Sequence, residues 1–434
     1  MLSLGLFENI FNLFITMAEF RVWYSTESFA DYIIDHTELK NHTVTKRQMY
    51  ESDASKPKDF HSLPHHIKQI LYLDAPDLIV ECNMEPIFSV EITTEAGTGH
   101  NAFQRFARIA AAVENNVPAI YIYPEAALIS RKSKKGSVKW DAINPLIFKA
   151  LERVRDIYHI PALLFYYPTH YPLSLSDITP SMKRSKGLKN DSDIIKYAAC
   201  PDSTDSEMKL LFRTLDLIIT ETQKHGVIEG RKGLLGKRDI ISRCDWMNNE
   251  FYRKKGSNQM SPLTATQIVD TQYLLNHLKH YSKKQSELLL SRKETVIYQV
   301  SANFRGDPYP GALSAIDYLL CREGKTFEER AYNLVLCWGT VVCDPVKNDF
   351  TIIDSRRRPK KPLGSINDFI KAVKDCGSRN LLGLDYKQIK KKGIPRYYMQ
   401  VRYGSMFSKK KEIRVFSYFA DAILFTDGAL WREG

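Results

Sequence analysis

The chain has 434 residues, of which 44% are hydrophobic and 26% are charged. This length exceeds the need of one typical domain, so we expect two or three domains. The composition is typical of a soluble globular protein and excludes a disordered chain. Of the net charge of +12, most lies in residues 351–434, which hold 19 Lys or Arg against 8 Asp or Glu. Such a basic region favours a polyanionic partner, with a solvated Lys-rich surface as the alternative.

The cysteines and the first residues limit the compartment. Seven cysteines are spread along the chain without a CxxC pair, which indicates neither a zinc site nor a disulfide framework. We therefore expect a cytoplasmic protein. Residues 1–20 are apolar, but no Lys or Arg precedes Arg21 and Glu8 interrupts the run, so they match neither a signal peptide nor a membrane span. We expect a leader before a start at Met17, or an added N-terminal helix.

The first half of the chain predicts alternating helices and strands. A capped helix is expected over 26–36 and a second helix over 59–72. Strand-like runs at 78–82 and 87–93 flank a turn at 83–86. An amphipathic pattern over 101–115 predicts a helix, and the apolar run 117–123 a buried strand. A helix at 143–158 and a strand at 161–167 follow. This order predicts an α/β fold, with a mixed central sheet flanked by helices.

The second half predicts further helices before a mixed region. Helices are expected over 206–225 and 263–291. From residue 296 strands mix with helices near 311–321 and 365–376. We therefore divide the chain into an α/β domain at 21–200, a mainly helical connecting region at 201–295 and a basic α+β domain at 296–434. We find no internal repeat in the sequence.

Two carboxylates stand out near the strands at 78–82 and 87–93. If the turn centres between Met84 and Glu85, Asp77 falls opposite Ile92, and Glu91 lies beside it. Strand alternation places Glu91 and Thr93 on one face, and Val90 and Ile92 on the apolar face. Clustered carboxylates repel each other, and a hard divalent cation such as Mg²⁺ relieves that cost. Such an ion also suits phosphodiester hydrolysis. The alternative is a strand start and an exposed acid without chemistry.

This stretch resembles the PD-(D/E)xK nuclease superfamily. Pro76-Asp77 matches the Pro-Asp of the motif, and Glu91-Ile92-Thr93 stands where its second tripeptide belongs. The hairpin, helix and strand that follow match the family's αβββαβ core. The resemblance covers about 50 residues and implies a catalytic domain at 21–200 with Mg²⁺ held by Asp77 and Glu91. Thr93 replaces the family's lysine, so Thr93, Glu95 or Gln104 is expected to take over its role.

A glycine-containing segment follows the motif. Gly97 and Gly99 precede the helix predicted over 101–115, and a loop feeding a helix N-terminus presents free N–H groups to an anion. We expect Gly97, Gly99, His100 and Arg105 to contact the DNA backbone near the scissile phosphate. A plain capping loop is the alternative.

The basic C-terminal region is expected to hold the DNA. Its most compact cluster is Arg356-Arg357-Arg358-Pro359-Lys360-Lys361. Arg305 lies in the distinctive stretch 301–326, which is either a recognition loop or a structural turn. The resemblance implies a Mg²⁺-dependent restriction endonuclease that cuts double-stranded DNA, works as a homodimer and needs no membrane. A nuclease fold that binds DNA without cutting it, and a non-specific repair nuclease, are the alternatives.

Overall fold

A computed structural model describes most of the chain outside its loops and basic C-terminal segment. The described residues are 18–49, 62–93, 101–124, 126–130, 138–142, 144, 146–167, 197, 200–235, 262–278, 283–300, 308–337, 339–353, 415–416, 418–424, 428 and 430–431. Among these residues, no helix is both long and apolar enough to cross a membrane. The fold is α/β and contains two mixed sheets with helices packed against them.

The first sheet has six strands in the order β2-β1-β3-β4-β5-β8. Its strands are β1 (Phe20–Tyr24), β2 (Val44–Gln48), β3 (Leu78–Cys82), β4 (Glu85–Ile92), β5 (Ala119–Pro124) and β8 (Ala162–Tyr167). Strand β3 runs antiparallel to both β1 and β4, whereas β5 and β8 run parallel to β4. A separate hairpin joins β6 (Ala126–Ser130) to β7 (Val138–Ala142).

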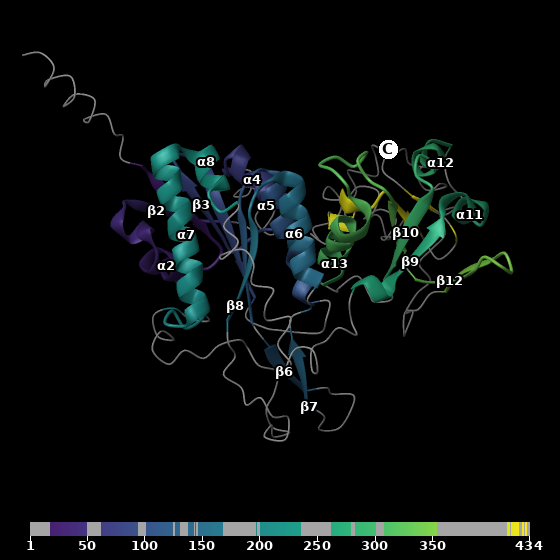
Figure 1. Cartoon of the computed structure of the whole chain (residues 1–434), viewed down its shortest axis with the longest axis horizontal. Coiled ribbons are helices and arrows are strands. Elements are labelled where there is room, and N and C mark those ends of the chain that lie inside the picture. Colours follow the sequence, from purple (N-terminus) through teal and green to yellow (C-terminus); the bar gives the residue numbers. More distant parts are fainter. Residues whose placement is uncertain are drawn as a thin grey trace, which may run out of the picture.

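Helices cover both faces of the first sheet (Figure 1). One face packs against α2 (Glu27–His36), α7 (Ser206–His225) and the short α8 (Val227–Lys232). The other packs against α4 (His65–Leu71), α5 (Phe106–Glu114) and α6 (Leu146–Tyr158). Burial on both faces explains the continuous apolar runs of β3, β5 and β8. The helices expected over 26–36 and 206–225 are confirmed.

The second sheet has five strands in the order β15-β14-β11-β10-β9. They are β9 (Thr266–Asp270), β10 (Glu294–Gln299), β11 (Asn333–Cys337), β14 (Ala422–Leu424) and β15 (Leu430–Trp431). Helix α13 (Pro308–Ile316) lies on the side that faces the first sheet, and it continues into one π-helical turn, η8 (Asp317–Cys321). Helices α11 (Thr271–Asn276) and α12 (Lys283–Leu290) pack against the opposite face of this sheet, together with the hairpin of β12 (Thr340–Asp344) and β13 (Asp349–Ile353).

One helix prediction is wrong in part. The single helix expected over 263–291 contains strand β9 at Thr266–Asp270, and two short helices follow it. The β-branched residues Thr266, Ile268 and Val269 favour an extended chain, and β9 pairs with β10. Pairing with β10, which lies later in the chain, therefore stabilises the extended conformation of residues 266–270. The helix expected over 365–376 lies outside the described residues.

Candidate active site

The β3–β4 hairpin brings two carboxylates together. Leu78 pairs with Val90, so Asp77 and Glu91 are the next residues beyond this pair. The Oδ2 atom of Asp77 accepts a hydrogen bond from the backbone N–H of Ile92 at 2.9 Å. Its Oδ1 atom accepts one from the Ser25 hydroxyl at 3.1 Å. These two bonds hold the Asp77 carboxylate against the end of β4, beside Glu91.

The register of this hairpin differs from the expected one. Cys82 pairs with Glu85, so the turn contains only Asn83 and Met84, which have φ angles of 52° and 65°. A two-residue turn with positive φ at both positions matches the twist of the flanking strands. A β-bulge between Val80 and Glu81 then shifts the pairing by one residue, so Asp77 is aligned with Glu91 and not with Ile92. The expected distribution of the β4 side chains over the two faces is confirmed, since Glu91 points towards α5 and Val90 into the opposite core.

Glu91 is 2% exposed and is held by two arginines from the start of α5. Nη1 of Arg108 donates to both carboxylate oxygens of Glu91 at 2.8 Å, and its Nε donates to Asp74 Oδ2 at 2.7 Å. Nε of Arg105 lies 3.2 Å from Glu91 Oε1. Asp74, Glu91 and Arg108 thus form a buried ionic network whose partners are 17 and 34 residues apart in sequence.

Burial dominates the electrostatics of this network. It raises the pKa of Glu91 to about 8, against the opposing effect of Arg108, and the nearby Asp77 raises that pKa further. Burial also lowers the pKa of Arg108, but Glu91 and Asp74 outweigh it and hold that pKa well above its usual value. The three carboxylates face two guanidinium groups, so one negative charge is unbalanced when all of them are ionised.

Thr93, at the position of the motif lysine, is buried and its hydroxyl pairs with Tyr121. The two hydroxyl oxygens are 3.0 Å apart, and Tyr167 donates its hydroxyl to the backbone carbonyl of Thr93 at 2.8 Å. Burial raises the pKa of Tyr121 above its usual range, so the phenol stays protonated. Thr93 therefore belongs to a buried chain of neutral hydroxyl groups.

The remaining predicted site residues divide into two groups. Gln104 and Arg105 are half-buried at the start of α5. Outside the described residues lie Gly97, Gly99, His100, Arg305, Arg356, Arg357, Arg358, Lys360 and Lys361. Sequence reasoning missed Asp74 and Arg108. A usable signal for Arg108 was its place in the otherwise apolar stretch FARIAAAV, since a charge on a buried helix face requires a partner.

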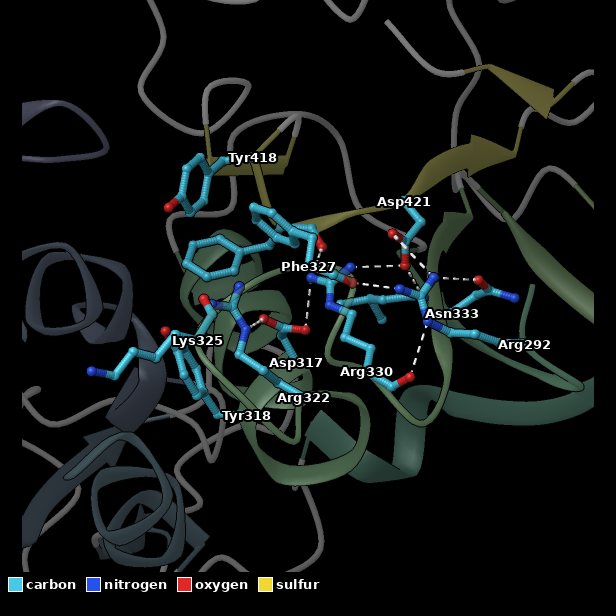
Figure 2. Close-up of polar contacts among 12 residues, drawn as sticks. Arg292, Asp317, Tyr318, Arg322, Lys325, Phe327, Arg330, Asn333, Tyr418 and Asp421 are labelled. Carbon is cyan, nitrogen blue, oxygen red and sulfur yellow. Dashed lines mark hydrogen bonds and ion pairs between the residues drawn. The ribbon is translucent and has the colours of Figure 1, made fainter. Parts of the chain in front are cut away.

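A second set of charged side chains is buried around the second sheet (Figure 2). Asp317 accepts a hydrogen bond from Arg322 Nε at 2.8 Å, and its other oxygen lies 2.7 Å from Nη2 of Arg330. Nη1 of Arg330 lies 2.8 Å from Asp421. The Arg322 and Arg330 guanidinium groups also lie 4.7 and 4.4 Å from the ring centroid of Phe327.

This second set also ties the second sheet to helices of the first. Nη1 of Arg322 lies 3.8 Å from Glu114 at the end of α5, and it donates to the Tyr158 hydroxyl of α6 at 3.1 Å. The Tyr318 and Tyr418 hydroxyl groups donate to Glu114, each at 2.5 Å. The side chains of Asp317, Arg322 and Arg330 are at most 1% exposed. The set is enclosed and serves packing, so Asp77 and its neighbours remain the candidate active site.

Comparison of this chain with protein-family models, curated proteins and solved structures finds no match.

Proposed function

We propose that this chain is a Mg²⁺-dependent endonuclease that hydrolyses phosphodiester bonds in double-stranded DNA, and specifically a restriction endonuclease. The observation that carries the proposal is the pairing of Asp77 with Glu91 at the end of the β3–β4 hairpin, beside two arginines of α5. Carboxylates that can hold a metal and cations that can bind phosphate are the two elements that phosphodiester hydrolysis requires.

The topology around the site supports the resemblance to the PD-(D/E)xK superfamily. Strands β1, β3 and β4 are neighbours and alternate in direction. Helix α5 then crosses over, and β5 pairs parallel to β4. The segment β3–β4–α5–β5 agrees with the ββαβ part of the core that the resemblance implies, whereas α2, β2 and α4 separate β1 from β3 in the chain. Asp77 directly precedes β3 and Glu91 lies on β4, which supports the proposed match to the motif.

The donor set fits a divalent cation. Among the described residues, no group of three or more His, Cys, Asp or Glu side chains could hold a metal ion. Mg²⁺, however, commonly takes one or two protein carboxylates and completes its shell with water and phosphate oxygens. Asp77 and Glu91 would hold it, and the ion would balance the negative charge left by three carboxylates that face two guanidinium groups. The ion would supply Lewis-acid stabilisation of the phosphate charge.

The protein residues have separable roles in this proposal. Arg108, anchored by Asp74, fixes the orientation of the Glu91 carboxylate. Nε of Arg105 is engaged with Glu91, but its side chain is 24% exposed. The exposed part of this guanidinium would contact a phosphate oxygen. Together these two arginines provide the positive charge that the motif lysine would bring, whereas Thr93 is engaged with Tyr121.

The contact between Arg108 and Glu91 favours a second candidate function. Because Arg108 donates to both oxygens of Glu91, it already neutralises the acid that a metal would need. A nuclease fold stabilised in this way binds DNA without cutting it. The two candidates differ in metal-dependent cleavage alone.

Cleavage of unmethylated phage and plasmid DNA, with Mg²⁺ or with EDTA, tests the proposal. We expect discrete fragments with Mg²⁺ only, and their loss in Asp77→Asn and Glu91→Gln, both of which should still bind DNA. Glu85→Gln is the matched control, because this exposed acid lies at the opposite end of β4 and should retain full activity. Smeared products would indicate a non-specific repair nuclease. Binding without cleavage in the wild type would support the second candidate.

A further inference from the structure

Donors from the two strands that flank β3 hold the carboxylate of Asp77. The hydroxyl of Ser25, which directly follows β1, donates to its Oδ1 atom at 3.1 Å. The backbone N–H of Ile92, at the end of β4, donates to its Oδ2 atom at 2.9 Å. One donor on each oxygen restricts the rotation of the carboxylate about its Cβ–Cγ bond. Because an ionised carboxylate has about four lone-pair sites, both oxygens keep the capacity to bind a cation.

The Ser25 hydroxyl contacts Asp77 although the backbone already joins the two residues. Tyr24 pairs with Leu78 in the β1–β3 ladder. Just beyond this pair, the Ser25 N–H donates to the Asp77 carbonyl oxygen at 2.9 Å. The hydroxyl lies 3.3 Å from the same carbonyl oxygen, which is farther than its distance to Oδ1. The side chain is therefore not required to align β1 with β3, and what it adds is a contact with the carboxylate.

The helix that follows Ser25 does not explain the serine either. A hydroxyl residue beside a helix start commonly caps the helix. Helix α2 begins at Glu27, and its N-cap is Thr26, whose side chain forms no capping hydrogen bond. In the described part of the structure, the hydrogen bonds of the Ser25 hydroxyl both end on Asp77. The contact with Asp77 is thus the role that the structure gives to this side chain.

The donors on Asp77 are neutral, which distinguishes it from Glu91. Arg108 donates to both oxygens of Glu91 and offsets its charge. Ser25 and the Ile92 N–H orient Asp77 without adding positive charge. Asp77 therefore provides the larger part of the negative charge that would attract a cation. Loss of a contact that orients a metal ligand typically lowers metal affinity or activity about 10–100-fold.

We propose that Ser25 is a positioning residue that sets the affinity of the site for a divalent cation, because it holds the Asp77 carboxylate in the orientation that binds the ion. This role rests on the proposed function. Ser25 acts through Asp77 and contacts neither the cation nor the scissile phosphate. Its loss should weaken cation binding, whereas the rate of hydrolysis at a saturating cation concentration should stay close to that of the wild type.

Binding of Mn²⁺ to the full chain, followed by the electron paramagnetic resonance signal of the free ion, tests this role without hydrolysis. We expect Ser25→Ala to raise the Mn²⁺ dissociation constant about 10-fold at an unchanged thermal midpoint. Ser25→Thr keeps the hydroxyl and should bind Mn²⁺ as the wild type does, whereas Asp77→Asn should bind it more weakly than Ser25→Ala. Ser286→Ala is the matched control, because it removes a serine hydroxyl that donates to the Lys283 carbonyl on α12 at 2.8 Å, and it should leave the affinity unchanged.

Plasmid cleavage at increasing Mg²⁺ concentrations separates cation affinity from chemistry. Ser25→Ala should need about 10-fold more Mg²⁺ for its half-maximal rate, with an unchanged maximal rate. An unchanged Mn²⁺ affinity in Ser25→Ala, beside an active wild type, would overturn the role of Ser25 and leave the proposed function standing. A lower maximal rate at unchanged affinity would also overturn it, because the hydroxyl would then act in hydrolysis itself. Absence of both Mn²⁺ binding and cleavage in the wild type would defeat the proposed function, and the role of Ser25 with it.

Discussion

Replacing Asp317 by Asn should destabilise the fold strongly. The Asp317 carboxylate is fully buried and accepts contacts from Arg322 and Arg330 at 2.8 and 2.7 Å (Figure 2). The variant keeps the size of the side chain but removes its charge. Both guanidinium groups stay buried, because Tyr318 and Phe327 enclose them, and they cannot move to solvent.

The magnitude follows from two opposing effects. Leaving a buried charge without its partner typically costs about 3–5 kcal/mol. Burial raises the pKa of Asp317 because desolvation penalises the ionised carboxylate, and the substitution relieves that penalty. The nearby Asp421 and Glu114 also retain part of the counter-charge. We therefore expect the lower end of the range, about 3 kcal/mol.

Urea unfolding followed by circular dichroism measures the effect. The midpoint of Asp317→Asn should fall clearly below that of the wild type. Glu287→Gln provides the control, since Glu287 and Lys283 form an exposed pair at 3.7 Å and such pairs contribute little. Equal midpoints for Asp317→Asn and the wild type would refute the view that this carboxylate compensates the two arginines.

Further substitutions test the helix contact and the candidate site. Gly311→Ala should lower the thermal midpoint, because overpacking against the Phe103 backbone costs about 1–3 kcal/mol. This cost exceeds the gain in helix propensity of about 1 kcal/mol. Ser314→Ala, on the same helix, is the control and should change the midpoint far less. Arg108→Lys should bind DNA but cleave it more slowly, since an ammonium group cannot span both Asp74 and Glu91; an unchanged rate would remove Arg108 from the site. Thr93→Val should cleave within a few fold of the wild-type rate, because its hydroxyl is bonded to Tyr121. A loss of about 10²-fold or more would mean that Thr93 assists the attacking water.

Local patterns predicted the elements near the site well. Strand β3 begins and ends where its apolar run does, at Leu78 and Cys82. The hairpin register was missed for two reasons. Asn83 and Met84 adopt left-handed conformations that non-glycine residues rarely take, so the turn was placed too late. The sequence also did not reveal the β-bulge between Val80 and Glu81. The error changed the residue expected opposite Asp77 by one position. Asp77 and Glu91 were still expected to lie close together, because both carboxylates stand at the open end of the hairpin.

Contacts between distant segments were beyond sequence reasoning. Arg108 bonds to Asp74 only because α5 crosses over the sheet, and hydrophobic periodicity carries no information on that pairing. The same limit explains β9, which forms a strand through β10 although its surroundings favour helices. Side chains that form such long-range ion pairs can be recognised in the sequence mainly where a charged residue, such as Arg108, interrupts an apolar run.

The close packing of the two sheets connects the stability of the fold with the proposed function. Helix α5 of the first sheet and helix α13 of the second are buried against each other. This contact leaves little space, because a Cβ atom at Gly311 would lie 1.7 Å from the backbone oxygen of Phe103. Charged groups enclosed there require partners, and Asp317 obtains them from Arg322 and Arg330. Around the first sheet, Asp77 is half-buried, and Arg105 is 24% exposed with its Nε 3.2 Å from Glu91 Oε1. The three carboxylates Asp74, Asp77 and Glu91 face only two guanidinium groups there, and under the proposed function a bound Mg²⁺ would supply the further positive charge.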